Sequence, residues 1–120
     1  DVGTELAIRL FGDESLFVGY SEVRYTAPVF AGDWMEYGGY IEKVGNTSFT
    51  CKFFAYKWMK DSKDENGNVI NGSGAEMINP PELCAYGTGT LMVAKHLQRP
   101  EFGDPKFAAD AKAAGAKAFA

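Results

Sequence analysis

The sequence is poor in the residues that build metal centres and many hydrolase sites. It contains a single histidine, His96, and two cysteines, Cys51 and Cys84, which stand 33 positions apart. Two cysteines this far apart and one histidine do not match the ligand spacing of a zinc or haem site, and a disulfide framework would use more cysteines at closer spacing. A Gly-x-Ser-x-Gly segment is also missing, and the Gly-Thr-Gly run at 87–89 is not followed by Gly-Lys-Ser/Thr. These absences exclude metal chemistry and a triad hydrolase, and they favour a strand bulge over a phosphate loop at 87–89.

Long apolar runs and excess positive charge are lacking as well. No stretch approaches the ~18 consecutive apolar residues that a membrane span needs, and the chain opens with DVGTEL rather than a signal peptide. The net charge of −4 argues against a nucleic-acid partner. Both cysteines sit in apolar, strand-like runs, as buried reduced thiols do. We therefore expect a cytoplasmic protein that binds neither membrane nor nucleic acid.

What the chain does have is glycine and aromatic residues, in a length that suits one domain. It has 120 residues, 14 of them glycine, and 14% are aromatic, a mixture that favours twisted strands joined by tight turns. Val2, Leu6 and Leu10 form one apolar stripe of a predicted helix over residues 1–10. Strands are predicted at 15–29, 34–44, 48–59 and 83–95, with a Gly-Asn hairpin turn at 45–46 and a polar loop insertion at 61–82.

These elements predict an α+β domain over residues 1–95, in which a curved antiparallel sheet packs on one helix. The Ala- and Lys-rich segment 96–120 is expected to be a frayed helix or a disordered tail. The chain lacks an initiator Met and starts in the middle of a helical pattern, so we expect a strand and the helix start to precede it. Strands that are apolar on both faces also predict a second subunit on the outer face.

The predicted helix carries two carboxylates, Asp1 and Glu5, on one face. Their separation of four residues places them about 5–6 Å apart at Cβ, and such a pair can raise the pKa of one member toward that of a general base. The competing interpretation is that Glu5 forms an ordinary surface bridge with Arg9, also four residues away, worth only ~0.3–0.5 kcal/mol. The pattern alone favours the surface bridge.

Several segments resemble the hot-dog-fold acyl-CoA enzymes. YTAPVFAGD at 25–33 and EKVGNTS at 42–48 look like the central hairpin of that family, and DVGTEL resembles the middle of its helix, where thioesterases carry a catalytic Asp. As a set, DVGTEL, GDWMEYGGYIEKVGNTSFTCKFFAYK and PPELCAYGTGTL are most similar to the β-alanyl-CoA and 3-aminobutyryl-CoA ammonia lyases, over about residues 1–95. The resemblance implies a sheet of five or six strands around a long helix, and a homo-oligomer that is a dimer or larger, up to a hexamer.

The resemblance also implies the reaction and its residues. Ammonia would leave a 3-aminoacyl-CoA once a base takes the proton next to the thioester, with Asp1 as the base and Glu5 holding the departing amine, or the reverse. Coenzyme A belongs to the substrate and no other cofactor is implied. The residues expected to receive its phosphates are Lys43, Gly45, Asn46, Thr47, Ser48 and, as a weaker candidate, Lys57. The alternative for the turn is a plain hairpin with positive φ at Gly45 and Asn46. The alternative functions are an acyl-CoA thioesterase and a non-catalytic acyl-CoA-binding module.

Overall fold

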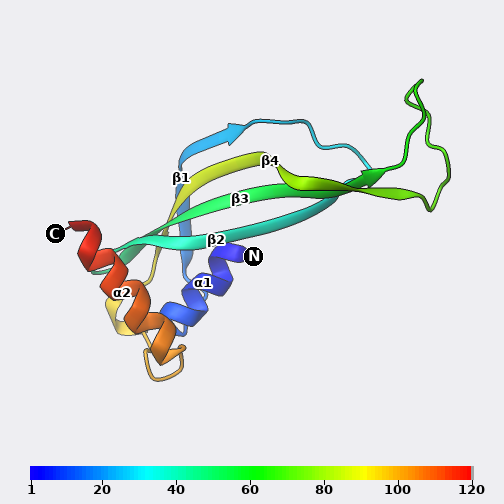
Figure 1. Ribbon diagram of the computed structural model, residues 1–120. Helices are drawn as coiled ribbons and strands as arrows, with labels where there is room; N and C mark the ends of the chain where they lie inside the picture. The colour runs from blue at the N-terminus through cyan, green and yellow to red at the C-terminus, as the bar shows by residue number, and fades with distance from the viewer. Residues whose placement is uncertain (120) are drawn as a thin grey trace. The chain divides into compact units, whose positions relative to one another are not determined.

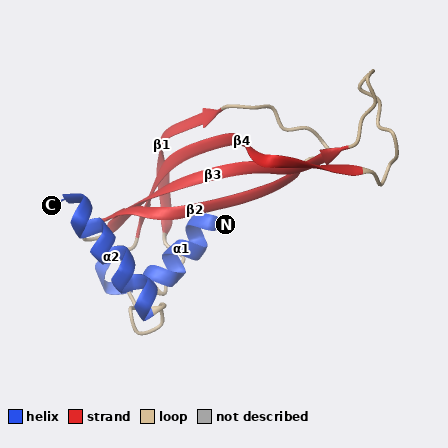
Figure 2. Ribbon diagram, in the orientation of Figure 1, coloured by secondary structure: helices blue, strands red, loops and turns tan. Residues whose placement is uncertain are grey.

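The computed structural model describes residues 1–119, which form two helices, four strands and one short 3-10 turn (Figure 1). The elements in chain order are α1 (Val2–Phe11), β1 (Leu16–Tyr25), β2 (Trp34–Val44), β3 (Ser48–Asp61), β4 (Ala75–Met92), η1 (Lys95–Leu97) and α2 (Pro105–Phe119). The strands form one sheet in the order β1-β4-β3-β2 (Figure 2). The chain divides into two compact units, unit 1 (residues 1–23, 38–53 and 87–120) and unit 2 (residues 24–37 and 54–86).

Helix α1 forms because its apolar residues recur at helical spacing and because a glycine ends it. Gly12 adopts the left-handed conformation with φ of 70°, and its N–H donates to the Ile8 carbonyl at 2.8 Å. The buried face of α1 consists of Gly3, Leu6, Ala7, Leu10 and Phe11. The predicted helix is therefore confirmed, and Val2 packs partly buried against the same cluster.

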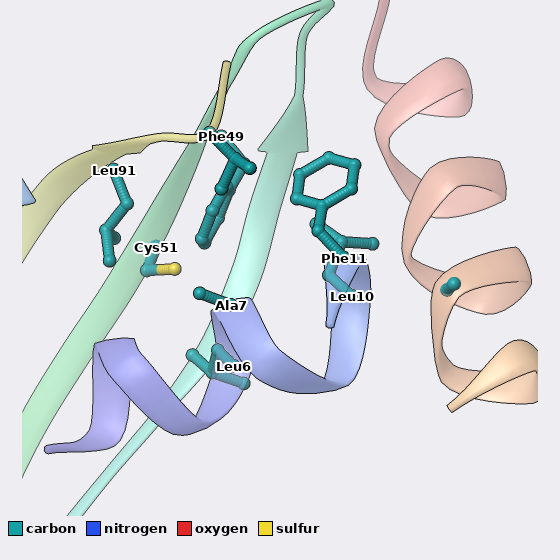
Figure 3. Packing of buried hydrophobic residues seen from close by; sticks show 9 residues of the cluster. Leu6, Ala7, Leu10, Phe11, Phe49, Cys51 and Leu91 are labelled. Atoms are coloured by element: carbon teal, nitrogen blue, oxygen red, sulfur yellow. The ribbon is translucent and has the colours of Figure 1, made fainter. Parts of the chain in front are cut away.

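The hydrophobic core lies in unit 1, between α1 and the sheet. Figure 3 shows the buried face of α1 opposite Phe49 and Cys51 of β3 and Leu91 of β4. Phe11 and Phe49 meet with ring centroids 5.9 Å apart. Full burial of a side chain such as Phe49 contributes roughly 1.5–3 kcal/mol, so this cluster is the main source of stability for the helix–sheet packing.

The predicted reduced thiols are confirmed, because Cys51 and Cys84 are both free and buried. Burial raises the pKa of the Cys51 thiol to about 12. Within residues 1–119, no helix has both the length and the apolar character that a bilayer crossing requires.

The hairpin between β2 and β3 is confirmed, but its backbone differs from the expectation. Neither Gly45 nor Asn46 has a positive φ. Three residues separate β2 from β3, and the Gly45 N–H donates to the Ser48 carbonyl at 2.7 Å. A loop of this length does not need the two left-handed residues of a two-residue type I′ turn.

The boundaries of β1 and β4 differ from the prediction. β1 ends at Tyr25 rather than at residue 29, because the next two N–H groups, of Thr26 and Ala27, both donate to the Cys84 carbonyl. β4 begins at Ala75, so the predicted loop of residues 61–82 ends at Gly74. Residues 75–82 of β4 extend past the end of β1 and have β3 as their strand neighbour. A proline whose missing N–H faces the open edge costs no ladder hydrogen bond. Because adjacent residues of a strand face opposite sides, this accounts for one of the two residues Pro80 and Pro81 within β4.

The C-terminal segment is not a tail. Helix α2 lies beside α1 in unit 1 (Figure 2), and its Ala108 is 7% exposed within the core cluster. Phe107 and Ala111 pack against the same cluster, and a Cβ added at Gly115 would stand 2.9 Å from the Val44 nitrogen. The segment was expected to be a frayed helix or a disordered tail. It is a helix, and its small side chains at helical spacing let it approach the core closely.

Candidate active site

The amino end of α1 carries the two predicted catalytic carboxylates. Asp1 is the N-cap residue, and its carbonyl accepts the first helical hydrogen bond, from the Glu5 N–H at 2.9 Å. Its side chain caps no backbone N–H, and it is exposed in the single chain.

Glu5 lies one turn further along α1 and pairs with Arg9. Arg9 Nη2 stands 3.0 Å from Glu5 Oε1, and the two side chains are 51% and 65% exposed. The guanidinium carbon of Arg9 also lies 5.9 Å from the centroid of the Phe107 ring of α2. The surface bridge that competed with the carboxylate pair is therefore formed, although an exposed pair of this kind is worth only ~0.3–0.5 kcal/mol.

The β2–β3 turn, which is predicted to receive coenzyme A, is held in place by hydrogen bonds that its backbone carbonyls accept. The Thr47 carbonyl accepts from the Val93 N–H at 2.8 Å, and the Asn46 carbonyl accepts from Gln98 Nε2 at 2.8 Å. Gly45, Asn46 and the adjacent Lys43 are exposed, whereas Thr47 and Ser48 are half-buried. The turn is thus an anchored part of unit 1 with an exposed tip.

Lys57 is placed differently from the other predicted ligands of coenzyme A. It lies in unit 2, and its side chain is 8% exposed. Its ammonium stands 3.1 Å from Asp33 Oδ2 and 3.8 Å from Glu82 Oε1, and it donates to the Pro28 carbonyl at 2.8 Å. A buried ammonium with these partners holds its own fold together, which speaks against a role in binding an anionic ligand.

The ion pair between Asp33 and Lys57 was not predicted from the sequence. Burial by itself would raise the pKa of this carboxyl, but the Phe30 N–H and the Lys57 ammonium outweigh that effect and lower the pKa. For Lys57, burial would lower the pKa, and Asp33 outweighs it and raises the pKa. Asp33 follows Gly32, which has a positive φ of 92°. No local pattern links residues 33 and 57, however, so the pair was not detectable from spacing.

The fold and the site can now be compared with known proteins. No protein-family model matches the chain. At 18% identity, it is similar to a hexameric hot-dog-fold thioesterase of Campylobacter jejuni, with a TM-score of 0.54 over 78% of this chain and 61% of that one. It is also similar to a hexameric broad-specificity acyl-coenzyme A thioesterase, with a TM-score of 0.65 at 16% identity over 96% of this chain and 73% of that one. These matches and the antiparallel sheet with a packed helix establish a hot-dog fold, as the sequence predicted.

Two relatives at higher identity define the family. The chain is 41% identical over 99 residues to a 3-aminobutyryl-CoA ammonia lyase of Acetoanaerobium sticklandii, covering 82% of this chain and 75% of that protein. It is 46% identical to the solved β-alanyl-CoA:ammonia lyase from Clostridium propionicum, with a TM-score of 0.79 over 92% of this chain and 73% of that one. The chain belongs to this family of ammonia lyases, and the predicted resemblance is confirmed.

Proposed function

We propose that this chain catalyses the reversible elimination of ammonia from a 3-aminoacyl-CoA, β-alanyl-CoA or 3-aminobutyryl-CoA, to give the enoyl-CoA. The observation that carries the proposal is the identity of 41% and 46% to two ammonia lyases over most of the chain. The thioesterases share only the fold, at 16% and 18% identity. The protein is therefore a carbon–nitrogen lyase that acts on a CoA thioester.

The carboxylates of α1 supply the proton chemistry in this proposal. The Asp1 carboxylate takes the proton from the carbon next to the thioester carbonyl, and that C–H electron pair forms the double bond of the enoyl-CoA. The bond from the neighbouring carbon to nitrogen breaks, and its electron pair leaves with the amine. Glu5 holds the substrate amine as its ammonium form before this bond breaks, so that neutral ammonia leaves. The proton on Asp1 then passes to the ammonia, which gives the ammonium ion and restores the carboxylate. The roles of the two residues can be exchanged, because both are carboxylates and they lie one turn apart on α1.

The exposed bridge to Arg9 does not oppose this assignment of Glu5. Its contribution is only ~0.3–0.5 kcal/mol, so a substrate ammonium brought to the site by its own thioester competes with Arg9 readily. No cofactor is needed, because proton transfer and departure of ammonia require no external oxidant or reductant.

Coenzyme A is proposed to reach the β2–β3 turn. Lys43 brings positive charge, and Gly45, Asn46, Thr47 and Ser48 bring backbone N–H groups and hydroxyls, which suit phosphate oxygens. Lys57 is left out, because its ammonium is committed to Asp33 and Pro28 within unit 2.

A homo-oligomer, a dimer or larger, is proposed as the working form. Asp1 and Glu5 are exposed in the single chain, whereas proton transfer from a carbon acid requires a site that excludes water. Strand β1 also leaves large apolar side chains uncovered, including Leu16, Val18 and Tyr20 at 67%, 56% and 60% exposure. A cytoplasmic location is proposed on the strength of the two buried free thiols.

The function is tested by adding ammonium to purified protein with acrylyl-CoA or crotonyl-CoA. The expected result is loss of the enoyl-thioester absorbance that depends on ammonium, with no release of free thiol. Release of coenzyme A thiol that does not depend on ammonium would identify a thioesterase instead. Binding of acyl-CoA with neither reaction would identify a non-catalytic binding module.

Asp1→Asn tests the residue assignment. Removal of the general base is expected to lower kcat by a factor on the order of 10² or more, while the melting temperature stays close to that of the unchanged protein because Asp1 is exposed and caps nothing. Asp110→Asn, which removes another exposed carboxylate of unit 1, serves as the control and is expected to keep full activity. Near-normal turnover by Asp1→Asn would refute the role of Asp1.

A further inference from the structure

One aromatic ring of β3 lies beneath the first turn of α1. Phe53 is half-buried on the same face of the strand as Cys51 and packs against the core cluster. A Cβ added at Gly3 of α1 would stand 3.3 Å from Phe53 Cζ. Gly3 lies between Asp1 and Glu5 in the chain, so the tip of this ring supports the backbone that carries both carboxylates.

Glycines of two neighbouring strands make room for the same ring. A Cβ at Gly39 of β2 would meet Phe53 Cδ1 at 3.0 Å, and one at Gly89 of β4 would meet Phe53 Cε2 at 2.8 Å. Distances below about 3.4 Å are tighter than ordinary van der Waals contact, so side chains at these positions would displace the ring. Tyr20 of β1 adds an edge contact, with ring centroids 6.2 Å apart. The ring is therefore fixed from the helix, from the two strands that flank β3 and from β1.

The size of the Phe53 ring consequently sets the height of the first helical turn above the sheet. The rest of α1 is fixed separately, through Leu6, Ala7, Leu10 and Phe11 in the buried core. A change at Phe53 is then expressed as a shift of the helix backbone at Gly3 rather than as loss of the helix. A misplacement of about 1 Å can reduce an enzymatic rate by up to ~10²-fold.

The geometry points to Phe53 as a positioning residue for the carboxylate pair, an inference that rests on the proposed function. Phe53 acts through the backbone at Gly3 and sets where Asp1 and Glu5 meet the substrate. Phe53 therefore affects the rate of proton transfer and does not affect the affinity for the CoA thioester, which other parts of the chain determine.

Phe53→Leu tests this, with Phe49→Leu as a matched control from the same strand and the same face. Phe49 is 1% exposed and packs on Phe11 at the carboxyl end of α1. For Phe53→Leu the expected result is a kcat roughly tenfold lower with KM unchanged. For Phe49→Leu the expected result is the larger fall in melting temperature with kcat unchanged.

Gly3→Ala provides a second variant that separates position from stability. Alanine favours a helix interior over glycine, so the melting temperature is expected to hold or to rise. The added methyl group would press on Phe53 and on Leu91 at 3.3 Å each and lift the first turn by a few tenths of an ångström. The expected result is a lower kcat in a protein that is no less stable.

The outcomes of these tests are distinct from those of the proposed function. If the unchanged protein shows no ammonium-dependent loss of enoyl-CoA, the proposed function fails. If it is active but Phe53→Leu and Phe49→Leu change kcat equally, Phe53 is ordinary core and the inference is overturned. A raised KM with normal kcat in Phe53→Leu would also overturn it, because the ring would then be contacting the substrate itself.

Discussion

The two compact units of the chain bury different kinds of side chain. Among the side chains that the structure describes, unit 1 buries a cluster that includes Leu10 and Phe11 of α1 and Phe49 of β3. Unit 2 buries only Ala55 and Cys84 among its apolar residues. In place of an aliphatic core, unit 2 buries the ion pair of Lys57 and Asp33. Unit 1 thus buries apolar side chains, and unit 2 buries a pair of charges that is costly to break.

This difference has a consequence for pH. Removal of apolar surface from water does not depend on protonation, so the core of unit 1 is insensitive to pH. A buried ion pair stabilises only while both members are ionised, and loss of one member leaves an unpaired charge in a poorly solvated place. Unit 2 is therefore the part of the chain that acid or strong base should loosen first.

Leu10→Ala is expected to have the largest effect on stability. Leu10 is fully buried, and truncation of such a residue costs about 4 kcal/mol of unfolding free energy. The loss should be the same at pH 7 and at pH 3.5. Urea titration at a fixed protein concentration measures it, since assembly makes stability depend on concentration. The control is Ile8→Ala on the same helix, where 43% exposure predicts a much smaller loss.

Asp33→Asn is expected to have the next largest effect, about 3 kcal/mol at pH 7. The substitution leaves Lys57 buried with only the Pro28 carbonyl and the more distant Glu82 as partners. Glu76→Gln is a suitable control, because it breaks the exposed pair with Lys60 in the same unit and should cost only ~0.2–1 kcal/mol. Equal losses from the two substitutions would show that burial of the pair contributes nothing.

The same pair predicts a pH profile with a definite sign. The pKa of Asp33 is lowered in the folded chain from an ordinary value of 3.8, so its contribution is complete above about pH 3.8 and is lost as the pH falls through the lowered value. The pKa of Lys57 is raised from 10.5, so its contribution is complete below that pH and is lost as the pH rises through the raised value. The stability difference between the unchanged protein and Asp33→Asn should therefore be constant between these limits and shrink outside them.

The same contrast explains what the sequence could predict. Helix α1 and the β2–β3 hairpin carry their signals locally, in the spacing of Val2, Leu6 and Leu10 and in the turn at Gly45-Asn46, and both were predicted correctly. Unit 2 depends on a pairing between residues 33 and 57, which no local period encodes. The packing of α2 was missed for a similar reason, because Ala108 and Gly115 contribute close approach rather than a recognisable apolar stripe. The role of Asp1 was suggested by resemblance to a family and not by its surroundings in the sequence.

The smallest expected effect concerns the exposed pair of Arg9 and Glu5, which contrasts with the buried pair of unit 2. Arg9→Gln removes a bridge worth ~0.3–0.5 kcal/mol, so the melting temperature should barely change. If Glu5 holds the amine, loss of Arg9 leaves the whole charge of Glu5 available to ammonium. An energy of ~0.3–0.5 kcal/mol corresponds to a KM for ammonium about twofold lower in the reverse reaction.

Lys106→Gln is the matched control for Arg9→Gln, because Lys106 forms the corresponding exposed pair with Asp110 on α2 at 3.9 Å. It should change neither stability nor KM. A raised KM for ammonium in Arg9→Gln would contradict the expectation and would mean that Arg9 holds Glu5 in its working position. The bridge, although too weak to stabilise the helix, would then contribute to the site by orienting a carboxylate. It would differ from the Lys57–Asp33 pair in role as well as in burial.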